Sequence, residues 1–197
     1  IYSRTRESAE QLSERLRDVP YSTDISRVPT DGDLYIFAVK DSALLDLVSR
    51  MPSNRGLWVH TAGSMDMEVF APYTARYGVF YPMQTFSKER ETDFDDIPIF
   101  VETNHTDDTE RLQKLAGRLS TKVYEATSEQ RKYLHLAAVF ACNFSNHLYA
   151  LCDRILSEHG LPFETMLPLI RETAAKVADM PPAQAQTGPA IDRKSVV

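Results

Sequence analysis

The sequence predicts an α/β fold, in which a parallel sheet is followed by an all-α C-terminal region. Up to residue 127, short apolar runs rich in strand-forming residues alternate with helical patterns, as expected of a parallel sheet with crossover helices. From Ser128 onward the pattern is helical only. We therefore expect two domains, 1–127 and 128–197, with their boundary near 127/128.

The individual elements follow from local patterns. "LYIFAV" (34–39) is typical of a strand buried on both faces, and Asp41 or Ser42 can cap the helix after it. A capping-box-like start at Ser128 opens about thirty helical residues, which Gly160 and Pro162 end. The other expected elements are helices at 5–18, 106–120 and 162–180, and strands at 55–63, 78–81, 96–103 and 121–127.

Composition excludes several classes of protein. The 197 residues carry a formal net charge of −6 without a basic cluster, which disfavours nucleic-acid binding. No apolar stretch approaches the roughly 20 residues of a membrane span. Cys142 and Cys152 lie in one helical segment, where ten residues rise about 15 Å, too far for a disulfide. Reduced thiols in a cytoplasmic protein are the simpler interpretation.

The opening "IYSRT" resembles the end of the second strand of a Rossmann-type dinucleotide fold, where the adenosine ribose is bound. An acidic residue there favours NAD, and Ser3-Arg4-Thr5 contains none. Arg4 offers a charged fork for a 2′-phosphate, and the two hydroxyls can donate to it as well. The segment predicts a preference for NADP(H), with a solvated arginine at the start of a surface helix as the alternative.

The glycine-rich phosphate loop of such folds is not seen in the chain. None of the seven glycines are spaced as G-x-G-x-x-G. A sheet that lacks its central first strand would leave unpaired edges in its middle. We therefore expect the natural polypeptide to carry a first strand, glycine loop and helix before Ile1.

Six stretches together resemble a known family: "YSRT", "FAVKD", "VHTAGS", "GVFYPMQTF", "HLAAVFACNFSNHL" and "TGPA". The chain resembles bacterial Rossmann-like proteins with an uncharacterised helical C-terminal domain. These are relatives of deazaflavin-dependent NADP reductases and pyrroline carboxylate reductase, within a superfamily that includes 6-phosphogluconate dehydrogenase-like proteins. The resemblance implies an NADP-binding domain, and a helical domain through which such proteins often form homodimers.

Two strand ends predict further cofactor contacts, because ligands bind at the carboxyl ends of parallel strands. Val39, Lys40 and Asp41 follow the first buried strand, and a similar "VK" stands there in pyrroline carboxylate reductase. His60, Thr61, Ala62 and Gly63 follow the next, where small residues and a glycine with unusual torsions would let the backbone approach a nicotinamide ring. His60 and Ser64 could face a substrate. The alternatives are a helix cap for Asp41 and a carbonyl-bonded strand-end histidine for His60.

The helix from Ser128 carries the candidate catalytic residues. Its stretch 134–152 is apolar nearly all round and is expected to be buried, yet it contains His135, Asn143, Asn146 and His147. We assign His135 and Asn143 as the catalytic candidates, with structural amides bonding a neighbouring helix or a dimer mate as the alternative.

One departure from the wider superfamily concerns the proton donor. The β-hydroxyacid dehydrogenases use a lysine four residues before an asparagine, whereas Val139 precedes Asn143 and Cys142 precedes Asn146 by that spacing. If the protein reduces a carbonyl or imine, His135 is the best proton donor and Tyr81 a weaker one.

The remaining motifs add little. "QTGPA" (186–190) could hold an anionic substrate through its amides, or be a plain loop. No spacing of histidines and cysteines suits a metal site. The sequence therefore predicts an NADP(H)-dependent oxidoreductase acting on a small carbonyl or imine compound. The alternative is a non-catalytic protein of the same fold that senses NADP or a metabolite.

Overall fold

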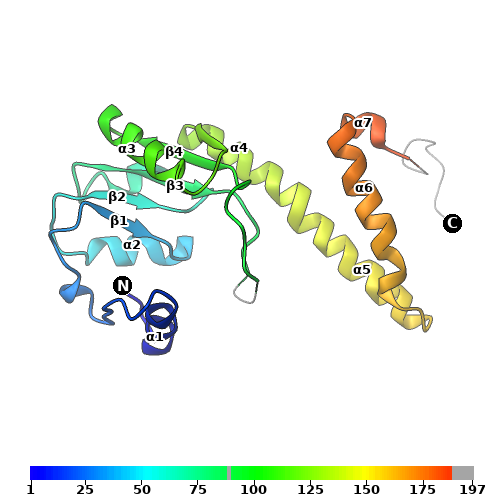
Figure 1. The fold of residues 1–197 in the computed structure, drawn as a ribbon, viewed down its shortest axis with the longest axis horizontal. Helices are drawn as coiled ribbons and strands as arrows, with labels where there is room; N and C mark the ends of the chain where they lie inside the picture. Colours follow the sequence, from blue (N-terminus) through cyan, green and yellow to red (C-terminus); the bar gives the residue numbers. More distant parts are fainter. Residues whose placement is uncertain (88–89, 188–197) are drawn as a thin grey trace. The chain divides into compact units, whose positions relative to one another are not determined.

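The computed structural model describes residues 1–87 and 90–187, and the chain divides into two compact units, 1–139 and 140–197. Each unit is described by itself (Figure 1). The boundary predicted near 127/128 falls at the start of helix α4 (Ser128–Ala138), whereas the division of the chain into compact units falls just after this helix.

A five-stranded sheet in the order β1-β2-β3-β4-β5 forms the centre of the first unit. β1, β2 and β3 are parallel, β4 runs antiparallel to β3, and β5 is parallel to β4. The predicted α/β class is confirmed, but the last two strands run against the first three. The reason is the connection 83–98, whose described part contains no crossover helix, so that the chain turns back on itself. The strands are β1 (Leu34–Phe37), β2 (Leu57–His60), β3 (Tyr77–Pro82), β4 (Ile99–Thr103) and β5 (Val123–Glu125).

Helices cover both faces of this sheet, with α2 (Asp41–Ser49) on one side and α3 (Thr106–Ala116) on the other (Figure 1). β2 is buried along its whole length because both faces of the sheet are covered there. Alternate side chains of a strand point to opposite faces, so its residues divide between two clusters. Leu57 and Val59 pack in the cluster that includes Leu112 and Ala116 of α3. Trp58 packs with Leu44 and Val48 of α2. The other helical segments of this unit are α1 (Arg6–Arg15), η1 (Ile25–Arg27), η2 (Met67–Phe70) and α4.

Three local expectations need correction. β1 is not buried on both faces: Ile36 is 52% exposed, because β1 is the edge strand of the sheet. α2 has Lys40 as its N-cap and no side-chain cap, because the Asp41 carboxylate accepts a bond from Ser64 instead. The capping box of α4 begins one residue earlier than expected, with Thr127 and Gln130 as its two members.

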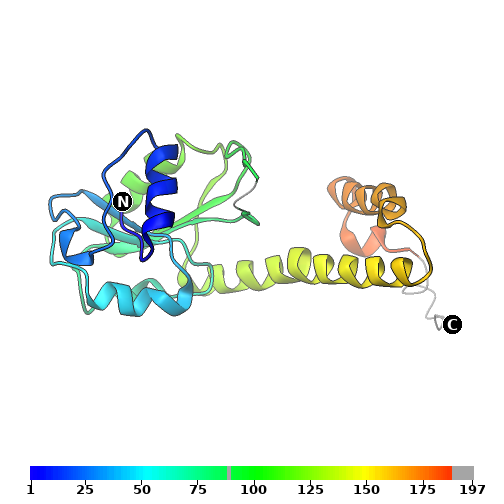
Figure 2. The ribbon, with the colours of Figure 1, turned by 90° about the horizontal axis from the view of Figure 1, so that it is seen from below.

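The chain start takes a minimal strand-like form. Tyr2 makes an isolated parallel bridge with Ser22, and the Ser3 amide donates to the Ser22 carbonyl at 3.2 Å. α1 follows directly, and the view of Figure 2 shows it in blue next to the N-terminus.

The described part of the second unit is helical. A π-helical segment (Val139–Phe144) leads from α4 into α5 (Ser145–Glu158), which ends before Gly160 at a φ of +70°. η4 (Phe163–Met166), α6 (Leu167–Asp179) and α7 (Pro182–Ala185) follow. None of the described residues of these helices are buried. The expectation that 134–152 is buried is therefore wrong within the described chain, because every residue of this stretch is exposed or half-buried.

Candidate functional site

The candidate site is built around the loop that follows β2. β1, β2 and β3 are parallel, so their carboxyl ends share one edge of the sheet, and the loop 61–66 leaves that edge between β2 and η2. In open α/β sheets ligands bind at this edge. The predicted residues Thr61, Ala62 and Gly63 all belong to this loop, and Gly63 is buried.

Gly63 brings together two of the predicted proton donors. A Cβ atom built on Gly63 would lie 2.8 Å from His135 Nδ1 and 2.9 Å from the Tyr81 hydroxyl oxygen. The imidazole from α4 and the phenol from β3 therefore converge on one point of the loop backbone. Both side chains are only half-buried, so each keeps an accessible part. Burial raises the pKa of Tyr81, which keeps its hydroxyl protonated at neutral pH.

The glycine at this position is required by space and not by backbone torsion. Among the described residues, Gly160 is the only glycine with a positive φ. The expected unusual torsion of Gly63 is therefore absent, and the close approach of His135 and Tyr81 explains why a side chain is excluded.

His60 is fully buried at the end of β2. Its Nδ1 accepts from the Ala62 amide at 3.2 Å, and its Nε2 lies 3.4 Å from the Asp66 carbonyl oxygen. Burial, with a smaller contribution from the Arg131 charge, lowers the pKa of His60 to about 4. The His60 side chain is thus a buried, neutral group that bonds to the loop backbone, as the alternative of a carbonyl-bonded histidine predicted. Only the backbone of His60 lies at the ligand edge.

The segment after β1 reaches the same loop. Val39, Lys40 and Asp41 are exposed, and the Asp41 carboxylate accepts a 2.5 Å hydrogen bond from the Ser64 hydroxyl. This bond connects the first turn of α2 to Ser64, the residue next to Gly63. The Lys40 side chain is exposed at the same edge of the sheet.

At the chain start, Arg4 and Thr5 are exposed and Ser3 is half-buried. Thr5 is the N-cap of α1 but makes no capping bond. Arg6, the next basic residue, donates to Glu10 at 2.7 Å, and the Tyr21 hydroxyl donates to the same carboxylate oxygen at 2.7 Å. Arg4 makes no ion pair within the described part of the chain, so it is the arginine available to an anion here.

Asn143 lies in the second unit, exposed within the π-helical segment. Asn146 and His147 are exposed in α5. Asn143 lies in the π-helical segment and the other two follow it, so the angular spacing of the three side chains differs from that of a regular α-helix. Of "QTGPA", Gly188 and the residues after it lie outside the described part of the chain.

A buried ion pair that the sequence did not reveal supports the loop. The Arg131 guanidinium, 0% exposed, donates to Glu102 Oε2 at 2.7 Å. It also donates to the carbonyls of Ala62 (3.3 Å) and Met65, two residues of the loop 61–66. Nothing in the sequence pattern predicted a buried arginine at this position.

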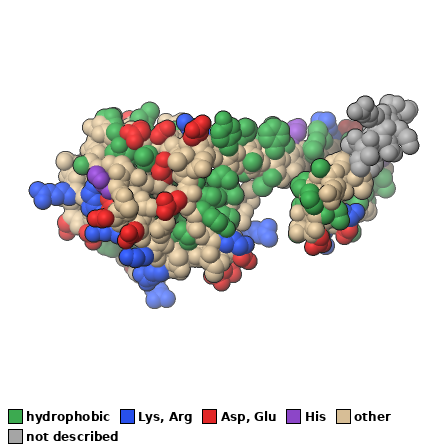
Figure 3. Space-filling model, turned by 90° about the horizontal axis from the view of Figure 1, so that it is seen from above, with side chains coloured by type: hydrophobic (Ala, Val, Ile, Leu, Met, Phe, Trp, Pro, Cys, Tyr) green, Lys and Arg blue, Asp and Glu red, His purple; other side chains and the backbone are tan. Residues whose placement is uncertain are grey.

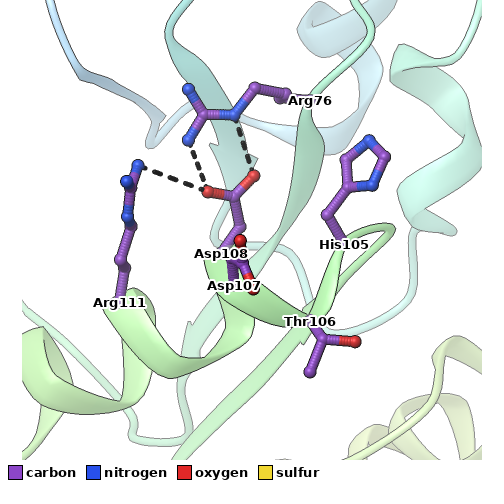
Figure 4. A pocket seen from close by; sticks show the side chains of 6 residues that line it. All are labelled: Arg76, His105, Thr106, Asp107, Asp108 and Arg111. Carbon is purple, nitrogen blue, oxygen red and sulfur yellow. Dashed lines mark hydrogen bonds and ion pairs between the residues drawn. The ribbon is translucent and has the colours of Figure 1, made fainter.

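Two cavities of the first unit lie at the opposite edge of the sheet. One is lined by residues at the start of α3 together with Arg76, which precedes β3, and Figure 4 shows the Arg76 guanidinium paired with Asp108 and Arg111 reaching the same carboxylate. The other contains Arg55 and Gly56, which precede β2. This edge is formed by the amino ends of β1, β2 and β3 and by the carboxyl end of the antiparallel β4, so neither cavity coincides with the predicted ligand edge.

Other kinds of site were sought in the same residues. In the described ranges, 1–87 and 90–187, no three His, Cys, Asp or Glu side chains gather as metal ligands would. Nor does any helix in these ranges combine the length and apolarity needed to cross a bilayer. Cys142 and Cys152 are both free thiols.

Comparison with known proteins identifies the family. A family model described as a domain of unknown function, DUF2520, matches residues 97–195, half of the chain. A Bacteroides fragilis protein, provisionally named an NADP oxidoreductase, has a crystal structure that is 51% identical, with a TM-score of 0.88, over 98% of this chain and 75% of that one. The chain belongs to the DUF2520 family. The predicted resemblance to Rossmann-like NADP oxidoreductases with an uncharacterised helical domain is confirmed.

More distant structures share the fold of this DUF2520 protein. A Thermotoga maritima protein is 25% identical with a TM-score of 0.74, over 96% of this chain and 74% of that one. A reductive aminase from Aspergillus terreus, in complex with NADPH, is 14% identical with a TM-score of 0.70, over 90% of this chain and 64% of that one. The comparison with curated proteins gave no match.

Proposed function

We propose that this DUF2520 protein is an NADP(H)-dependent oxidoreductase acting on a small carbonyl or imine compound. The observation that carries the proposal is the convergence of His135 and Tyr81 on Gly63, at the ligand edge of a Rossmann-type sheet. The 51% identity to a protein provisionally named an NADP oxidoreductase supports the choice of cofactor.

The cofactor would extend along the carboxyl edge of β1 and β2. Ser3, Arg4 and Thr5 would hold the 2′-phosphate, because an arginine fork and free hydroxyls match its oxygens. Val39, Lys40 and Asp41 would line the ribose and pyrophosphate, since they are exposed where β1 ends. The backbone of His60 and the loop 61–63 would lie against the nicotinamide.

The chemistry divides between cofactor and chain. NADPH, when bound, supplies the hydride. His135 would donate the proton to the reduced substrate, since imidazole exchanges protons near neutral pH. Tyr81 would donate a hydrogen bond to the same substrate atom, because its raised pKa keeps the hydroxyl proton in place. Asn143 remains a proposed substrate ligand, and its exposure is compatible with that role.

The cofactor choice is tested by titrating the protein with NADPH and NADH. We expect tighter binding of NADPH. Arg4→Ala should weaken NADPH binding about 10–100-fold, the worth of a charge-assisted bond of about 1.5–3 kcal/mol, and leave NADH binding unchanged. Arg6→Ala is the matched control, because Glu10 already holds that guanidinium. Equal binding of the two cofactors, or equal effects of the two variants, would refute the 2′-phosphate assignment.

Catalysis is tested by screening oxo acids and imines for NADPH oxidation. We expect His135→Ala to abolish most of the rate on any substrate found. The absence of the superfamily's lysine, with Val139 at its place, favours the second candidate function, a sensor of NADP or a metabolite. NADPH binding without turnover of any compound in the screen would support that candidate.

A homodimer through the helices of the second unit is part of the proposal. Its described helices bury none of their side chains, and large apolar residues are exposed along them (Figure 3). Such surface favours association, because apolar area gains about 25 cal/mol per Å² when it leaves water. The exposed set includes Phe140, Phe144, Leu148, Ile155, Leu169 and Val177. Sedimentation should give twice the 22.3 kDa chain mass, and a monomer at micromolar concentration would refute it.

A further inference from the structure

A buried ion pair, Glu102–Arg131, lies behind the loop 61–66. Glu102 in β4 accepts three hydrogen bonds: from the Ser128 amide at 2.8 Å, the Ser128 hydroxyl at 2.7 Å and Arg131 Nη1 at 2.7 Å. Arg131 is fully buried, and its Nη2 also donates to Ser128 Oγ at 3.1 Å. The network therefore fixes the start of α4 against the sheet.

The same guanidinium also donates hydrogen bonds to the loop backbone. Arg131 Nε donates to the Ala62 carbonyl at 3.3 Å and Nη2 donates to the Met65 carbonyl. The Ser128 hydroxyl accepts from the Met67 amide at 3.2 Å. The loop backbone is thus held on both sides of Gly63 by groups from a single helix turn.

The next turn of that helix carries His135. Residues four apart lie on one face of an α-helix, so Arg131 and His135 approach the same loop from the same element. His135 Nδ1 would stand 2.8 Å from a Cβ on Gly63, whereas Arg131 holds the carbonyls at positions 62 and 65. The spacing between the loop backbone and the imidazole therefore depends on the Arg131 bonds.

We infer that Arg131, locked by Glu102, is a positioning residue that sets the loop 61–66 in place for the nicotinamide end of the cofactor. The inference rests on the proposed function. Arg131 donates to four acceptors, which are Glu102, the Ser128 hydroxyl and two loop carbonyls. A guanidinium suits this arrangement because its five N–H donors are spread over a planar fork, whereas an ammonium has three donors on one atom. The residue acts through the loop and does not touch the cofactor.

The test separates the two ends of NADPH. The probes are NADPH and adenosine 2′-phosphate 5′-diphosphate, which carries the adenosine half without the nicotinamide. We expect Arg131→Met in the full chain to weaken NADPH about tenfold and the fragment less than about twofold, since a misplaced loop affects only the end it contacts. Arg131→Lys should fall between Arg131→Met and the wild type.

Arg76→Met is the matched control. It breaks another arginine–carboxylate pair at the opposite edge of the sheet, in which Asp108 is buried and Arg76 is partly exposed (Figure 4). It should leave both affinities unchanged. If Arg131→Met does not fold, Ser128→Ala removes one partner of both Arg131 and Glu102, and should weaken NADPH about threefold without affecting the fragment.

The outcomes are distinct. Equal effects of Arg131→Met on NADPH and the fragment, or no effect on either, would overturn the positioning role and leave the proposed function intact. A wild-type protein that binds neither probe would overturn the proposed function, and the role of Arg131 with it.

Discussion

Replacing Gly63 with alanine perturbs the site at one point. The new Cβ would lie 2.8 Å from His135 Nδ1 and 2.9 Å from Cζ and the hydroxyl oxygen of Tyr81. Distances under 3.0 Å are essentially never seen for real Cβ atoms, so both rings or the loop backbone must shift. The backbone torsion at Gly63 poses no obstacle, because its φ is not positive. The effect measured is therefore crowding alone.

The expected magnitude combines two terms. Overpacking by one carbon in a packed site costs about 1–3 kcal/mol. Replacing glycine by alanine also lowers the freedom of the unfolded chain, which restores about 0.4–1 kcal/mol. We therefore expect Gly63→Ala to lower the free energy of unfolding by about 1–2 kcal/mol. Gly117→Ala is the control, since Gly117 has φ −65° and its nearest Cβ contact is 3.3 Å.

The assay is a double-mutant cycle on denaturant unfolding of Gly63→Ala and His135→Ala. Removing the imidazole removes the closest contact, so Gly63→Ala should cost at least about 0.5 kcal/mol less in the His135→Ala background. An identical cost in both backgrounds would show that His135 does not press on Gly63. The convergence on which the proposed function stands would then be wrong.

Three further results are expected. The pKa of His60 is about 4 when folded and near 6.5 when unfolded, so the unfolded state binds the extra proton between these values and stability falls as the pH falls. Denaturant curves should show a loss of about 2 kcal/mol between pH 6.5 and 5, and His60→Gln should lose clearly less. Gly78→Ala should prevent folding, judged by circular dichroism, because its Cβ would lie 2.7 Å from Thr103 Cγ2 and closer still to the Glu102 carbonyl oxygen. Ser64→Ala should cost about 1 kcal/mol in thermal unfolding by removing the bond to Asp41, and an unchanged midpoint would contradict that bond.

Elements with a clear period were predictable from the sequence. β2 is buried at every position because both of its faces are covered, and an unbroken apolar run is the direct mark of that environment. The end of α5 was predictable as well, because Gly160 adopts the left-handed conformation that stops a helix. The direction of β4 was not, because an apolar run has the same appearance in parallel and antiparallel sheets.

The candidate site was predictable in part, and the reason lies in the kind of contact. His135 and Gly63 were each identified, one as a polar residue in an apolar helix and the other as a glycine at a strand end. Their contact joins positions far apart in sequence, which no local pattern encodes. Arg131 was missed altogether, since an arginine among Gln130 and Lys132 has the appearance of a solvated helix start. Only the sheet contributes the Glu102 that makes its burial tolerable.

Two of the arginine–carboxylate pairs in the first unit, Arg76–Asp108 and Arg131–Glu102, differ in what else the arginine binds. A buried ion pair adds little net stability, because removing two charges from water offsets their attraction, and an apolar replacement is often neutral. Stability alone therefore does not account for a buried arginine at this site. Arg76 donates its hydrogen bonds to Asp108 and to the Arg55 carbonyl at the amino edge of the sheet. Arg131 donates two of its hydrogen bonds to loop carbonyls at the ligand edge. The Arg76 pair thus stabilises the fold at the amino edge, whereas the Arg131 pair fixes the geometry of the loop 61–66. Only the loss of the Arg131 pair should change the affinity for the nicotinamide half of NADPH.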